Sequence, residues 1–266
     1  MNRELKKQLK RIDKKEKRIL NKKKKPILKA KADPVMHRIQ QKIPEKLKST
    51  LESAFYKGFQ LVFEKGHIYI EKTYNKDRLQ LEYDLNNYLV DKNISKRNIK
   101  KLDKQAKISK RLNSGISVLE GGVLGILGIG LPDIPLFISV IMKTIYELAL
   151  NYGYSYETEE EKVYILLLIC GAMSNGERQR KFNEEIDKLG NLIDSNGHVE
   201  TDLKKQMTTT SNILSEAMLT AKFIQGIPIV GVVGGVVNYS IIKKIGKYSS
   251  LKYKKRYLIK KLNAQH

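Results

Sequence analysis

Apolar residues recur at helical spacing along most of the chain. In residues 35–59 a large apolar side chain stands at every fourth position, which places them on one face of a helix. Pro44 interrupts this run and predicts the start of a new helix. Similar spacing returns at residues 81–89 and 94–112, and almost no stretch alternates as a strand does. The sequence therefore predicts an all-α fold.

Local signals place several helix ends. Thr158, followed three positions later by Glu161, forms a capping-box pattern that predicts a helix through the apolar run 163–170. The tetrapeptide 194–197, Asp-Ser-Asn-Gly, predicts a turn after a helix over about 178–193. We expect Ser211 to cap a further helix over 213–224.

Two segments, 115–142 and 223–242, are rich in glycine and break the amphipathic pattern. Segment 223–242 has 20 residues without a formal charge, which just spans a bilayer core of about 30 Å. In 115–142, Glu120 and Asp133 leave a charge-free stretch that is too short to span.

Glycines stand four apart in both segments, at Gly121 and Gly125 and at Gly231 and Gly235. Such spacing favours close approach of two helices, so we expect the two segments to pack together. Both a tightly packed core and insertion into a bilayer fit this pattern.

Composition and charge narrow the expected partners. The chain has 266 residues, 41% of them hydrophobic, and a formal net charge of +23. Residues 1–31 carry +12, residues 95–111 carry +7 and residues 243–261 carry +9, so the remainder is mildly acidic at −5. We expect a Lys-rich arm over 1–33, either helical or disordered, before a single domain over 34–266.

The order of motifs in the middle of the chain resembles the EcsC family. A glycine-rich run is followed by the hexapeptide 131–136, Leu-Pro-Asp-Ile-Pro-Leu, and then by Tyr152-Gly153-Tyr154 and an acidic helix start. A second glycine-rich helix follows near 226–246. The resemblance covers about 47–258 and leaves the Lys-rich arm outside. It implies a bacterial protein whose gene neighbours that of an exporter-type ABC transporter, and it brings no catalytic residues.

No residue pattern predicts a defined active site. Asp133 stands where a helix cap is needed, and with Glu120 it also suits the head of a ligand or lipid groove lined by Gly121, Gly125, Gly231 and Gly235. The lone Cys170 lies in an apolar run and predicts a core position. The histidines lack metal-ligand spacing and no phosphate-binding loop is present, so we expect neither a metal nor a cofactor.

Lysine dominates the basic segments, which favours a lipid surface over base recognition. We expect a non-enzymatic protein that docks peripherally on the cytoplasmic face of the cell membrane and serves a membrane transporter. Integral insertion of the protein into the bilayer stays open as an alternative. The residues expected to bind anionic lipid are Lys22, Lys23, Lys24, Lys25, Lys243, Lys244, Lys252, Lys254, Lys255 and Arg256.

Two alternatives stay open. The first is an enzyme that uses Asp133 and Glu120 on a small molecule or lipid. The second is an RNA-binding protein, because Tyr248, Tyr253 and Tyr257 interleave with basic residues near the C-terminus.

Overall fold

The computed structural model describes residues 2–21, 44–66, 70–104, 106, 133–224 and 234–264. Every regular element in these ranges is a helix and none is a strand, which confirms the all-α prediction. The predicted packing of the two glycine-rich segments falls largely on residues outside these ranges.

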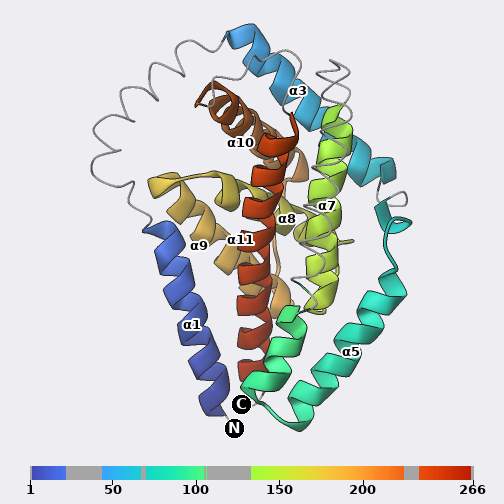
Figure 1. Ribbon diagram of the computed structural model, residues 1–266, viewed down its shortest axis with the longest axis vertical. Coiled ribbons are helices and arrows are strands. Elements are labelled where there is room, and N and C mark those ends of the chain that lie inside the picture. The colour runs from blue at the N-terminus through green and yellow to red at the C-terminus, as the bar shows by residue number, and fades with distance from the viewer. Residues whose placement is uncertain are drawn as a thin grey trace.

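The helices surround one long central helix, α11, as Figure 1 shows. Helix α1 lies along one side of α11, while α7 lies along the other. The bounds of the elements are α1 (Asn2–Leu20), α3 (Glu45–Leu61), the π-helical turn η1 (Val62–Gly66), α5 (Lys76–Lys92), α7 (Asp133–Asn151), α8 (Glu159–Met173), α9 (Gly176–Asp194), α10 (Leu203–Ile224) and α11 (Gly234–Asn263).

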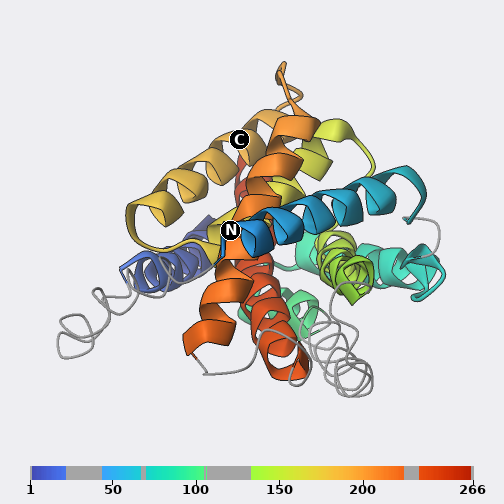
Figure 2. The same cartoon turned by 90° about the horizontal axis from the view of Figure 1, so that it is seen from above.

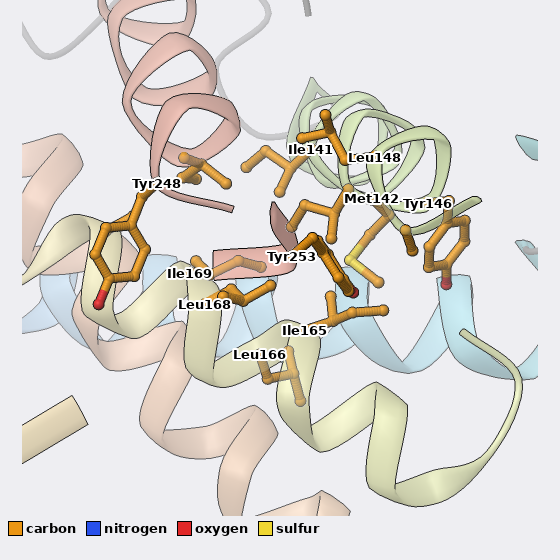
Figure 3. Packing of buried hydrophobic residues seen from close by; sticks show 14 of the residues in the cluster. Ile141, Met142, Tyr146, Leu148, Ile165, Leu166, Leu168, Ile169, Tyr248 and Tyr253 are labelled. Carbon is orange, nitrogen blue, oxygen red and sulfur yellow. The ribbon is translucent and has the colours of Figure 1, made fainter. Parts of the chain in front are cut away.

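Helix α8 forms the centre of the core. It is apolar on all sides, which is expected of a helix that is covered all round. It packs against α9, α10 and α11, and every residue from 163 to 172 except the small Gly171 contributes a buried side chain. Figure 3 shows side chains of α7, α8 and α11 meeting here, with Tyr253 of α11 between Met142 and Ile165. Viewed from above, α3 lies beside α10, which it contacts closely (Figure 2).

Helix α7 carries the one stretch within the described residues, Ile134–Asn151, that is long and apolar enough to cross a membrane. Within the fold 78% of this stretch is buried. A buried core helix satisfies the same criteria, and α7 packs against α3, α5 and α11.

Helix α1 is part of the packed structure. Its Leu5 and Ile12 are buried in the same core cluster as the other helices, and the helix contacts α11 and α9. Residues 2–20 of the expected arm are therefore helical. The expected boundary at residue 33 lies outside the described residues and stays a prediction.

The helix starts were predicted with mixed success. Thr158 is the N-cap of α8, and its hydroxyl accepts a hydrogen bond from the Glu161 amide at 3.3 Å, as expected. The prediction for Ser211 is wrong, because α10 already begins at Leu203 and the Ser211 hydroxyl donates to the Met207 carbonyl inside the helix. Asp202 caps this helix instead, accepting from the Lys205 amide at 2.9 Å.

Candidate functional site

The second half of α11 carries a cluster of cations that carboxylates neutralise from within the fold. Lys252 Nζ lies 2.6 Å from Glu16 Oε1 and 2.7 Å from Asp187 Oδ1. Lys255 Nζ lies 2.7 Å from Glu16 Oε2 and 2.8 Å from Asp187 Oδ2. Two lysines of α11 therefore share two carboxylates, one from α1 and one from α9. This arrangement ties the three helices together.

Arg256 is held one helical turn further along. Its guanidinium donates two hydrogen bonds to Glu161, at 2.7 and 3.0 Å, and its Nε donates to Asp194 at 2.7 Å. The guanidinium also lies 4.2 Å from the ring centroid of Tyr154 and 4.8 Å from that of Tyr164. This geometry combines bidentate carboxylate binding with cation–π contacts to two tyrosine rings.

Burial and pairing act against each other in this ion pair. Burial lowers the pKa of Arg256, but the hydrogen bonds that it donates to its carboxylate partners outweigh burial and hold this pKa above its ordinary value. Burial raises the pKa of Glu161 by more than the hydrogen bonds and charge of Arg256 lower it, so this pKa lies above its ordinary value. Arg256 thus stays charged and serves as the counter-ion of two acids.

Two further pairs extend the neutralised region. Lys254 Nζ lies 2.6 Å from Asp103 Oδ2, and Lys261 Nζ lies 2.5 Å from Asp91 Oδ1. The cations of the C-terminal basic segment therefore form ion pairs with carboxylates from five different helices.

These contacts correct part of the expected lipid-binding set. Lys252 and Arg256 are only 1% and 4% exposed, and Lys254 and Lys255 are largely covered and ion-paired. Charges that are buried and paired in this way cannot meet lipid headgroups. Of the remaining expected residues, Lys243 and Lys244 are exposed, and Lys22, Lys23, Lys24 and Lys25 lie outside the described residues.

The predicted groove falls mainly where the structure is not described. Glu120, Gly121, Gly125 and Gly231 are outside the described ranges. Asp133 is the first residue of α7, and Gly235 lies in the first turn of α11. The grouping of these residues therefore stays a prediction.

A second set of cations faces outward. On α1 and on a short helix over residues 96–104, exposed lysines and arginines lie opposite the buried apolar positions. None of them forms an ion pair with another described residue. We call this set the outer basic surface, and it comprises Arg3, Lys6, Lys7, Lys10, Lys14, Lys15, Lys17, Arg18, Lys96, Arg97, Lys100, Lys101 and Lys104.

The tyrosines that suggested RNA binding are part of the core. Tyr248, Tyr253 and Tyr257 are 2%, 0% and 2% exposed. Tyr248 donates to Asn183 and Tyr257 to Asn87. Stacking on nucleic-acid bases needs accessible rings, so this argument for RNA binding does not hold.

The Tyr-Gly-Tyr motif has a structural role. Gly153 adopts a φ of +77°, and a Cβ atom there would overlap the ring of Tyr83. Tyr152 and Tyr154 on either side are buried, and the Tyr152 hydroxyl donates to Asp103 at 3.2 Å. The motif therefore forms a tight turn that ends α7, because the amides of Tyr152 and Tyr154 donate to the Ala149 carbonyl and the Gly153 amide donates to Leu150.

The single cysteine occupies a core position. Cys170 is buried and its sulfur lies 3.2 Å from the Thr210 hydroxyl. Burial raises the pKa of the Cys170 thiol to about 12, so the thiol is protonated at neutral pH and is a poor nucleophile. Among the described residues no group of His, Cys, Asp and Glu side chains is placed to hold a metal ion.

Sequence reasoning missed the ion pairs of α11, although a signal was present. Ile241, Ile245, Tyr248, Lys252 and Arg256 follow one another at three or four positions, on one helical face. The two cations continue an apolar stripe, which indicates that they point inward and need acidic partners. The identity of those partners depends on the packing of distant helices.

Comparison with known proteins defines the class. The model of the EcsC protein family matches residues 6–258. The chain belongs to the EcsC protein family. It is 23% identical over 212 residues to Protein EcsC of Bacillus subtilis (strain 168), an alignment that covers 79% of this chain and 78% of the relative. No solved structure gives a significant match. The family match begins at residue 6, so α1 lies inside the family region and not before it.

Proposed function

We propose that this protein docks peripherally on anionic membrane surfaces through the outer basic surface, without catalysing a reaction. The observation that supports this proposal is the division of the cations into two sets. Five cations in the second half of α11 are paired with carboxylates of the fold, namely Lys252, Lys254, Lys255, Arg256 and Lys261. The exposed lysines and arginines of α1 and the 96–104 helix face outward and form no ion pair with another described residue. The excess positive charge is therefore presented on the surface.

The magnitude of the attraction is sufficient for reversible docking. A lysine close to an anionic leaflet contributes about 1 kcal/mol. If five cations of the outer basic surface reach the headgroups, the sum of about 5 kcal/mol is comparable to the binding given by a single fatty acyl anchor. Salt screens such contacts over about 10 Å at moderate ionic strength, so docking should weaken as salt is added.

Membership of the EcsC family fits a membrane-associated protein. Docking on the cytoplasmic face would place the protein beside a membrane transporter, the partner that the family resemblance implies. Lys243 and Lys244, which are exposed on the first half of α11, would add to the contact if the glycine-rich segment before them also approaches the lipid.

Vesicle sedimentation tests the proposal. The wild-type protein should bind vesicles that contain phosphatidylglycerol, lose binding as salt is added, and ignore vesicles of phosphatidylcholine alone. Replacing Lys96, Lys100 and Lys101 with Gln should weaken binding substantially, by about fivefold for each lysine in contact. In a charge-matched control, Lys188, Lys204 and Lys205, which are exposed on α9 and α10, are also replaced with Gln. Equal weakening by both sets would contradict a defined docking surface.

A further inference from the structure

Helix α5 exposes an apolar stripe that the fold leaves uncovered. Leu81, Leu85 and Tyr88 are 69%, 61% and 61% exposed, and their spacing of four and three places them on one face of the helix. Leu79 and Val90, both buried, point in the opposite direction. Helix α5 therefore has one apolar face toward the core and a second toward the exterior.

The surroundings of the stripe favour a lipid surface as its occupant. Helix α5 ends at Lys92, and the 96–104 helix follows after a short turn, bringing five exposed cations of the outer basic surface next to it. This turn lies at the same end of the molecule as both chain termini (Figure 1). Apolar side chains beside unpaired lysines, with a tyrosine among them, are typical of a helix that lies in the interface of an anionic bilayer.

Two of the four acidic residues of α5 are neutralised by ion pairs. Asp91 is paired with Lys261, and Glu82 with Arg78 at 2.9 Å. Asp77 and Asp84 remain exposed on the N-terminal part of α5. Both carboxylates lie within four residues of Leu81, whereas only Asp84 lies that close to Tyr88. Repulsion by anionic headgroups therefore opposes contact near Leu81 more than contact near Tyr88.

From this arrangement we propose that α5 lies against the anionic membrane, with Leu81, Leu85 and Tyr88 in the interfacial layer and the cations of the 96–104 helix on the headgroups. The C-terminal end of α5, at Tyr88, enters deeper than the end at Leu81. This inference rests on the proposed docking function and adds the face that contacts the lipid.

Fluorescence of a single label tests the contact directly. In a Cys170→Ala background, Leu85→Cys or Tyr88→Cys is labelled with an environment-sensitive dye, and Glu184→Cys on the exposed side of α9 serves as the control. With phosphatidylglycerol vesicles, the dye on α5 should shift to the blue and become shielded from aqueous acrylamide, more at position 88 than at a matching Leu81→Cys label. The dye on α9 should not change.

Binding of stripe variants gives a second readout. Replacing Leu81, Leu85 and Tyr88 together with Gln should reduce vesicle affinity by at least about tenfold, because partial burial of three large apolar side chains corresponds to at least that factor. The matched control is Leu61→Gln, which changes a 53% exposed leucine at the end of α3. Asp84→Asn should increase affinity while the helical circular dichroism signal stays unchanged, which excludes unfolding as the source of the gain.

The outcomes separate this inference from the docking function. If the wild-type protein binds anionic vesicles but the α5 dye and the stripe variant behave like their controls, the stripe does not contact lipid and a protein partner becomes the better occupant, while docking stands. If the wild-type protein does not bind anionic vesicles at all, both the docking function and this inference are overturned.

Discussion

Removing the Arg256 side chain should destabilise the protein far more than removing an exposed arginine. Arg256→Ala leaves the carboxylate of Glu161, whose side chain is only 5% exposed, without its bidentate partner. Breaking a buried ion pair from one side costs about 3–5 kcal/mol. The lost contacts with the rings of Tyr154 and Tyr164 add about 1 kcal/mol. We expect Arg256→Ala to lower the free energy of unfolding by about 4–6 kcal/mol in total.

The matched control is Arg178→Ala. Arg178 binds Glu216 at 3.0 Å, but the two side chains are 50% and 45% exposed, and such surface pairs contribute about 0–1 kcal/mol. The free energy of unfolding is measured by urea denaturation followed by circular dichroism. A double variant, Arg256→Met with Glu161→Leu, should recover most of the loss because it buries no unpaired charge. The reasoning is refuted if Arg256→Ala and Arg178→Ala cost the same.

Three further predictions concern the core. Burial raises the pKa of ten of the 14 tyrosines, including Tyr83 to about 12. Tyrosines of the unfolded chain ionise near pH 10, so above that pH the unfolded state binds fewer protons than the native state. The free energy of unfolding therefore falls by up to about 1.4 kcal/mol per pH unit per tyrosine. Tyrosinate absorbance should rise in one step with loss of helix, and gradual titration with intact helix would contradict this. Cys170 should react with a thiol reagent at least about 100-fold slower in the native protein than in urea, and equal rates would disprove its burial. Gly153→Ala should lower the free energy of unfolding by about 2–4 kcal/mol, because Gly153 has a positive φ and the added Cβ would overlap Tyr83. Gly176→Ala should lower it by only about 1–2 kcal/mol, because Gly176 has a φ of +60° but open space around it. A reversed order in urea denaturation would argue against the tight turn.

The helical architecture was predictable because its causes are local. Four-residue apolar spacing and the cap at Thr158 depend only on neighbouring residues, and both predictions were confirmed. Ser211 shows the limit of such signals, since a serine inside a helix can bond back to the carbonyl four residues earlier. Asp202 offered an equally good cap and lay nine positions before it.

The partition of the charges was not predictable from local patterns. The net charge of a sequence segment counts every lysine of α11 as if it were free to bind an external anion. Lys252 meets Glu16, which is 236 positions earlier in the chain, and such a pairing follows only from the packing of α1 on α11. Contacts with other distant residues make Tyr253 and Tyr257 core residues and not candidates for base stacking: Tyr253 packs against Tyr154 and Tyr164, and Tyr257 against Tyr83 and Tyr152.

The N-terminal helix α1 is a part of the folded domain and not an arm that precedes it. The family match from residue 6 and the buried Leu5 and Ile12 make α1 a part of the fold that presents its lysines on one face. A fixed basic helix loses less conformational freedom on binding than a disordered arm, so docking on a surface is less opposed by ordering.

The most direct test of the docking account is sedimentation of the wild-type protein with vesicles of defined charge over a series of salt concentrations. We predict binding to phosphatidylglycerol-containing vesicles that falls as salt rises, and no binding to phosphatidylcholine vesicles. Equal binding to both vesicle types, or no binding to either, would contradict the claim that the outer basic surface serves to hold this protein on an anionic membrane.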